Sequence, residues 1–112
     1  MACGMGIPGG PGGGALFSGS REALRNALKT GWVEGMTGSQ GLRILARLGK
    51  SRVDDIAISA GENGNVVASF TKLLAKGKEV TIRTYDAAGR EVSTIREIYD
   101  AAGALVRRGV IR

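Results

Sequence analysis

Hydrophobic and polar positions alternate with two different periods along this chain, and the change of period separates a helical part from a part made of strands. Before residue 50, apolar residues recur at helical spacing, whereas after Val53 they alternate residue by residue between Gly-containing turns. This pattern predicts helices over 20–30 and 39–48. It also predicts strands over about 53–60, 65–73, 78–85, 90–99 and 104–111. We therefore expect an α+β fold, with one or two N-terminal helices packed on a four- to five-stranded antiparallel meander sheet.

Capping residues support both helices. Ser20 is a suitable N-cap for the first, and Glu22 lies in its first turn, where the helix dipole favours a negative charge. Ser39 is the expected N-cap of the second helix, and Gly49 is its expected C-cap.

The turns have an unusual feature, because the pentapeptide Tyr-Asp-Ala-Ala-Gly occurs at 85–89 and again at 99–103. Asp at the first position of a turn and Gly at the fourth are typical of a type I turn closed by a left-handed residue. The closing glycines fall at Gly64, Gly77, Gly89 and Gly103, a spacing typical of short hairpins.

Pairing Asp86 with Arg90, and Asp100 with Ala104, sets an expected register and divides the strands into two faces. The expected core face is apolar and carries Val80, Ile82, Thr84, Val92, Thr94, Ile98, Val106 and Val110. The expected polar face carries Arg83, Tyr85, Glu91, Ser93, Glu97, Tyr99 and Arg107. Arg96 and Arg108 would then oppose each other on the core face, so either they extend to water at the sheet periphery or a bulge shifts the register.

The length of 112 residues suits one domain. Residues 1–18 are Gly-rich at their start and are expected to be a disordered linker, with a single domain over 19–112. The chain has no His, and its lone Cys3 has no partner for an internal disulfide. Neither a signal peptide nor a transmembrane run is visible, and the cellular location stays open.

A formal net charge of +6 favours a polyanionic partner. Arg43, Arg47 and Lys50 follow i, i+4, i+7 spacing on the second helix, and Arg52 extends this basic run. These four residues, with Tyr85 as a stacking group, are the predicted nucleic-acid contacts. A solvated helix face is the alternative interpretation.

The expected polar face also contains groups for acid–base chemistry without His. Glu97 could be a general base, Arg83 and Arg107 could stabilise a phosphate, and Tyr99 could donate a proton. Because antiparallel sheets commonly leave one face wet, a purely solvated face is the alternative. We expect no cofactor and no metal ion, since Asp54 and Asp55 lack a third ligand nearby in sequence.

The paired Tyr-Asp-x-x-Gly motifs resemble the YD repeats of Rhs-type bacterial polymorphic toxins. The run Tyr99–Val106 is similar to the last strands of the toxin-tip modules in such proteins. Helices followed by an antiparallel meander also resemble the barnase/colicin-type ribonuclease architecture. The resemblance implies a secreted, toxin-like effector that acts in a target cytoplasm and meets a cognate immunity protein.

The leading hypothesis is a small basic domain that binds RNA and cleaves it by metal-independent attack of the 2′-hydroxyl. A non-enzymatic module that binds an acidic protein or nucleic acid is the second. A structural, YD-like hairpin or assembly domain is the third. We expect a monomer or a weak dimer, with no membrane partner.

Overall fold

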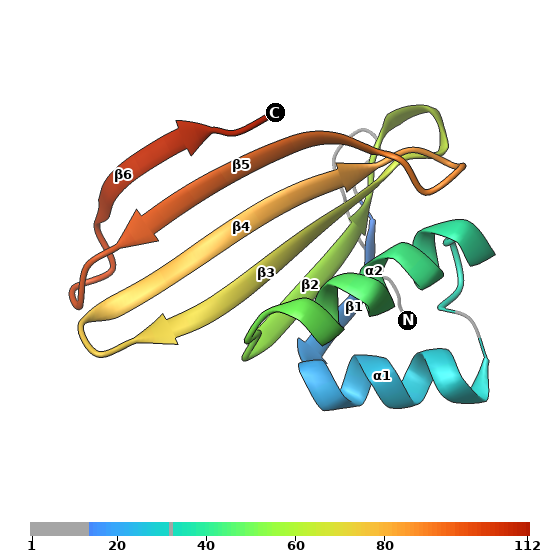
Figure 1. Ribbon diagram of the computed structural model, residues 1–112, viewed down its shortest axis with the longest axis horizontal. Helices are drawn as coiled ribbons and strands as arrows, with labels where there is room; N and C mark the ends of the chain where they lie inside the picture. The colour runs from blue at the N-terminus through green and yellow to red at the C-terminus, as the bar shows by residue number, and fades with distance from the viewer. Residues whose placement is uncertain (1–13, 32) are drawn as a thin grey trace, which may run out of the picture.

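The computed structural model describes residues 14–31 and 33–112. Two helices cover one end of a curved, six-stranded antiparallel sheet (Figure 1). The elements are β1 (Ala15–Ser20), α1 (Arg21–Thr30), α2 (Gly38–Lys50), β2 (Asp55–Ala60), η1 (Glu62–Gly64), β3 (Val66–Leu74), β4 (Gly77–Tyr85), β5 (Glu91–Tyr99) and β6 (Leu105–Val110). Strand order in space follows chain order, so the α+β meander is confirmed, with more strands than predicted.

The additional strand is β1, which lies partly within the predicted 1–18 linker. It pairs antiparallel with β2, and Ala60 N donates to Gly14 O at 2.8 Å. Leu16 and Phe17 pack against the core, so their burial stabilises the strand. The linker prediction is therefore wrong for 15–18, where a short apolar run follows many glycines. Residues 1–13 lie outside the described residues.

The N-cap of the first helix is as predicted, and the two caps of the second helix are not. Ser20 Oγ accepts from Ala23 N at 3.1 Å. In α2 the N-cap is Thr37, not Ser39, because Thr37 and Gln40 form a capping box. The helix also continues past Gly49 to Lys50, and its C-cap is Ser51.

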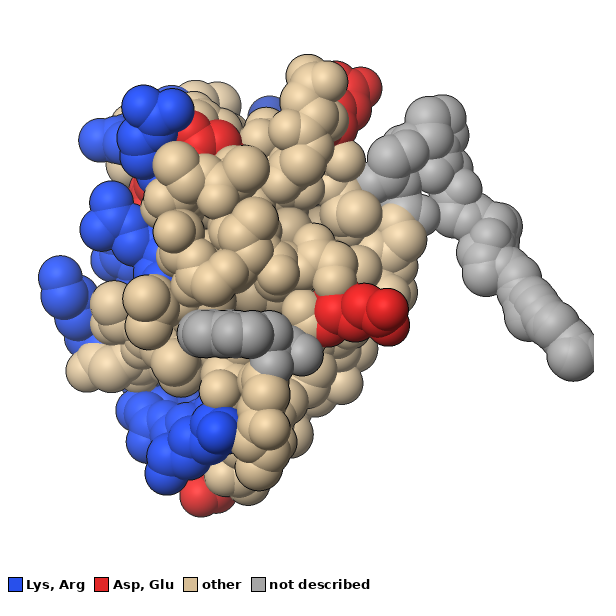
Figure 2. Space-filling model, turned by 90° about the vertical axis from the view of Figure 1, so that its right-hand side faces the viewer, with Lys and Arg blue, Asp and Glu red and all other residues tan. Residues whose placement is uncertain are grey.

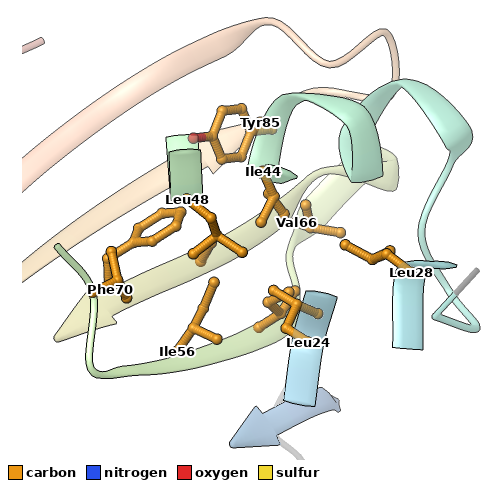
Figure 3. Close-up of a cluster of buried hydrophobic side chains, with 11 residues drawn as sticks. Leu24, Leu28, Ile44, Leu48, Ile56, Val66, Phe70 and Tyr85 are labelled. Carbon is orange, nitrogen blue, oxygen red and sulfur yellow. The ribbon is translucent and has the colours of Figure 1, made fainter. Parts of the chain in front are cut away.

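The hydrophobic core lies between the two helices and the β2–β3 half of the sheet (Figure 3). Its buried residues are Leu24, Leu28, Ile44, Leu48, Val53, Ile56, Ile58, Val66, Ala68, Phe70 and Tyr85. In β4, Tyr85 pairs with Val66 and Arg83 pairs with Ala68, so both share the helix-side face. Val80 and Ile82 therefore lie on the opposite face, and the predicted assignment of faces is wrong for β4.

Two β-bulges explain most of the remaining error in register. Tyr85–Glu91 and Tyr99–Leu105 pair as predicted, but the register then shifts by one residue in each hairpin. Glu97 therefore pairs with Arg108 rather than with Arg107. Because Arg96 pairs with Gly109, the two like charges do not meet, and the bulge alternative is confirmed.

A single buried amide joins α2 to two turns of the sheet. Gln40 is fully buried, its Oε1 accepts from Thr37 N at 2.9 Å, and its Nε2 donates to Gly64 O and to Asp86 O, both at 2.9 Å. Thr37 Oγ1 adds a bond to Ala87 O at 2.8 Å. These bonds fix the start of α2 against the η1 turn and the β4–β5 turn.

The two repeated turns offer a matched test of this docking. Gly89 and Gly103 both have positive φ, at 85° and 88°. A Cβ at Gly89 would lie 2.7 Å from Ser39 O in the first turn of α2, whereas a Cβ at Gly103 meets nothing within 4 Å. We expect Gly103→Ala to lower the free energy of unfolding by about 1 kcal/mol, through backbone strain alone. Gly89→Ala should lower it by about 3 kcal/mol, because α2 must also shift.

Urea unfolding of both variants measures these losses. Equal losses for Gly89→Ala and Gly103→Ala would contradict the close packing of the β4–β5 turn on α2.

Candidate functional site

Two adjoining pockets lie between the second half of α2 and the helix-side face of β4 and β5, and we call them together the cationic groove. The first has a volume of about 220 Å³ and is lined by Arg43, Ala46, Arg47, Lys50, Tyr85, Glu91 and Arg112. The second, of about 160 Å³, is lined by Arg47, Ser51, Arg52, Val53, Phe70, Lys72, Glu79, Thr81, Arg83 and Arg96. Arg47 lines both pockets, so the two are neighbours on either side of this residue.

Positive charge dominates the groove. Among the described residues, eight Lys and Arg side chains and two Glu side chains line the two pockets. Figure 2 views the molecule from the right-hand side of Figure 1, where the helices lie. It shows Lys and Arg gathered along one side of that surface. Such a concentration of one charge attracts anions to the groove.

The helical periodicity of α2 places the basic side chains there. Ile44 and Leu48 point into the core, so Arg43, Arg47 and Lys50 fall on the neighbouring face, along the sheet. Arg43 Nε donates to Gly89 O at 3.0 Å, which orients that guanidinium. The structure therefore brings the predicted basic stripe together, and Arg52 lies in the adjoining pocket.

Glu91 is the acid that lines the first pocket. Its Oε2 accepts from Arg83 Nη1 at 2.9 Å and from Thr94 Oγ1, and its Oε1 lies 3.5 Å from Arg47 Nη2. Burial opposes ionisation of this carboxyl, but the Thr94 hydrogen bond and the charges of Arg83 and Arg47 outweigh burial. The pKa of Glu91 is therefore below its ordinary value.

Tyr85 lines the first pocket from beneath. Its side chain is 1% exposed, and Figure 3 shows it beside Ile44 at the margin of the core. Burial raises the pKa of the Tyr85 hydroxyl, and the charge of Glu91 adds to this, while Arg83 and Arg47 act in the opposite direction. No described residue meets the geometry of a hydrogen bond with this hydroxyl, and Arg47 lies close enough to it to lower its pKa. The ring is too deeply buried to stack on a base as predicted.

The predicted catalytic set is divided between the two faces of the sheet. Arg83 lies in the groove, but Glu97 pairs with Val80 on the opposite face. There Tyr99 Oη donates to Glu97 Oε1 at 2.7 Å, and Arg108 Nε lies 3.4 Å from Glu97 Oε2. Arg107 is exposed on β6, opposite Ile98, outside both pockets of the groove.

The bulge after Glu91 accounts for this division. Even spacing along β5 was expected to place Glu91, Glu97 and Tyr99 on one face. One inserted residue moves the last two to the other face. Sequence reasoning therefore missed Glu91 and Thr94 as site residues, and it also missed Lys72, Arg96 and Arg112. For Glu91, the only sequence signal is its position opposite Tyr85, directly after a turn.

No family model, curated protein or solved structure matches this chain. Neither described helix is long and apolar enough to cross a membrane. Within residues 14–31 and 33–112, no three His, Cys, Asp or Glu side chains gather in a way that could hold a metal ion.

The lowered pKa of Glu91 predicts a pH-dependent contribution to stability. A carboxyl with a depressed pKa in the folded state stabilises the fold above its unfolded-state pKa, and the contribution is lost as the pH falls through the folded-state pKa. We expect Glu91→Gln to lower the free energy of unfolding by about 1–3 kcal/mol near pH 7, because Arg83 loses its charged partner. The difference between variant and wild type should shrink by about pH 3.

Urea unfolding at both pH values measures this difference. The control is Glu34→Gln, which changes an exposed residue between the helices and should have little effect at either pH. A Glu91→Gln difference that stays constant with pH would contradict the assignment.

Proposed function

We propose that this domain binds RNA, with the backbone phosphates of a single strand in the cationic groove. The observation that carries the proposal is the pair of pockets that share Arg47 and are lined by eight basic and two acidic side chains. Phosphates along one strand are successive negative charges, and a groove that follows a backbone with Lys and Arg is the usual way to hold them. Arg47, shared by both pockets, would lie between two such phosphates.

When the existing ion pairs are taken into account, the first pocket has more Lys and Arg side chains than the second that lack an acidic partner in the described part of the chain. In the second, Glu79 neutralises part of the charge through Lys72 at 3.6 Å and Arg96 at 3.0 Å. In the first, Glu91 is bound by Arg83 and Arg47. Arg43, Lys50 and Arg112 have no acidic partner among the described residues. Their charges are therefore available to a ligand.

The dimensions of the groove favour one strand over a duplex. The pockets are small, with volumes of about 220 and 160 Å³, and they lie between a helix and the sheet. A duplex presents two backbones on a wide cylinder, whereas a single strand follows a narrow channel. RNA is the proposed strand because of the resemblance of the Tyr-Asp-x-x-Gly motifs to toxin tips.

The proposal is limited to binding. RNA held in the groove would contact Arg83 but not Glu97 or Tyr99, which lie on the other face of the sheet. The predicted 2′-hydroxyl cleavage by that set of residues is therefore not part of it. The toxin-like role and the immunity partner stay predictions from the resemblance.

Two lysines in equivalent places allow a matched binding test. Lys50 lies in the last turn of α2 and lines the first pocket, whereas Lys29 lies in the last turn of α1 and lines neither pocket. We expect Lys50→Gln to weaken binding of a labelled single-stranded RNA several-fold and to reduce the salt slope by about 1. Lys29→Gln, which removes the same net charge, should leave both nearly unchanged.

Fluorescence anisotropy over a series of salt concentrations, with RNA, single-stranded DNA and polyglutamate, measures these effects. Equal losses in the two variants would show that net charge alone attracts RNA, and would remove the groove as the site. Tighter binding to polyglutamate than to RNA would favour an acidic protein as the partner.

A gel of the same RNA, after incubation with the protein in EDTA and in Mg²⁺, tests whether the protein only binds RNA or also cleaves it. Intact RNA is expected in both. Discrete fragments that disappear in Glu97→Gln would instead restore the predicted catalytic set.

A further inference from the structure

The first pocket of the cationic groove contains more hydrogen-bonding capacity than the protein itself uses. Tyr85 is almost fully buried, and its hydroxyl has no hydrogen-bond partner among the described residues. A buried, unpartnered polar group is unfavourable, so native proteins rarely keep one without a reason. Arg43 and Lys50 line the same pocket and have no acidic partner among the described residues, because Glu91, the acid that lines it, is paired with Arg83 and Arg47. These donors are arranged for an anion.

Two of the side chains that line the pocket are hydrogen-bonded to the backbone of the sheet. Arg43 Nε donates to Gly89 O at 3.0 Å, and Arg112 Nη1 donates to Glu91 O at 2.8 Å. These bonds tie two of the lining side chains to the β4–β5 turn and to the start of β5. At Arg47 the pocket adjoins the second one. A strand whose end lies in the first pocket would place its last phosphate beside Tyr85 and among the cations that line the pocket.

We propose that the first pocket binds a terminal phosphate, a phosphomonoester at the end of an RNA strand. In this arrangement the Tyr85 hydroxyl donates to one phosphate oxygen, while Arg43, Arg47, Lys50 and Arg112 surround the others. The inference rests on the proposed RNA binding for the strand that carries the phosphate.

Charge distinguishes a terminal phosphate from an internal one. A phosphomonoester carries about −1.5 to −2 at pH 7, whereas an internal phosphodiester carries a single negative charge. The four cations that line the pocket outnumber its one carboxylate, Glu91, which Arg83 already pairs. The surplus therefore matches a dianion better than a monoanion. The raised pKa of Tyr85 keeps its hydroxyl protonated, as a donor, at neutral pH.

The test compares three RNAs of one sequence, each with the same internal fluorophore: one with a 5′-phosphate, one with a 3′-phosphate, and one with hydroxyls at both ends. At about pH 7.5 we expect one phosphorylated RNA to bind about tenfold more tightly than the unphosphorylated one. The preference should shrink towards about pH 5.5, because the second phosphate pKa is near 6. The groups that face the phosphate are Arg43, Arg47, Lys50, Arg112 and Glu91. Glu91 stays ionised in this range, because its pKa is below its ordinary value.

Inorganic phosphate provides an arm of the test that is independent of RNA. It should compete for the preferred phosphorylated RNA more effectively than chloride does at matched ionic strength and pH. Competition equal to that of chloride would mean that the pocket responds to bulk ionic strength and not to a phosphate group, and would overturn the inference.

Tyr85→Phe and Tyr99→Phe form a matched pair, because both tyrosines open the same repeated motif. Tyr85→Phe removes the unpartnered hydroxyl, so it should abolish most of the preference for the phosphorylated end. It should leave the free energy of unfolding equal or higher, as expected when an unsatisfied buried group is removed. Tyr99→Phe, which loses the bond to Glu97 on the other face, should keep the full preference.

The outcomes separate this inference from the proposed function. Equal affinities for all three RNAs, or an unchanged preference in Tyr85→Phe, overturn the terminal-phosphate pocket, even if RNA binding stays sensitive to salt and to Lys50→Gln. If neither the wild type nor any variant binds RNA, while titration calorimetry still detects binding of inorganic phosphate, the proposed function is removed and the anion pocket is kept.

Discussion

The buried amide of Gln40 is the contact on which the arrangement of this molecule depends. One side chain caps its own helix and also holds two separate turns of the sheet, at Gly64 and Asp86. The start of α2 therefore has a fixed height and rotation over the sheet. Since a helix is stiff, fixing its start also fixes where Arg47 and Lys50 lie two to three turns later. The cationic groove exists because those side chains face β4 and β5 and not open solvent.

Much of the fold, and less of the site, could be predicted from the sequence. Helical and alternating periods identify two helices and five strands, and the Asp-x-x-Gly motifs fix the first pair of residues beyond each repeated turn. Beyond that pair, one inserted residue at a β-bulge exchanges the two faces of a strand, and no local sequence pattern predicts this bulge. Val92 looks like a core residue by alternation, but its side chain is 48% exposed. Strand β1 was missed because its short apolar run follows a Gly-rich stretch that masks it.

The two copies of Tyr-Asp-Ala-Ala-Gly show which structural features a local sequence determines and which it does not. Both form the same turn, with Asp Oδ1 accepting from two backbone amides in each copy and with Gly at positive φ. Their first residues nevertheless have different environments, because Tyr85 lies under α2 and Tyr99 lies on the uncovered face. The pentapeptide thus determines a backbone shape. The elements packed around it determine what its tyrosine can do.

The plain meander order of the sheet has a consequence for how the chain reaches this structure. From β2 to β6, every pairing joins strands connected by a short turn, so these hairpins close small loops on the microsecond scale. Among the described strands, only the pairing of β1 with β2 must bring together segments separated by both helices, and closing that longer loop has a larger entropic cost. We therefore expect the hairpins to assemble before the β1–α1–α2 segment docks. On this order of events the groove is the last feature of the molecule to form, since one of its walls is α2.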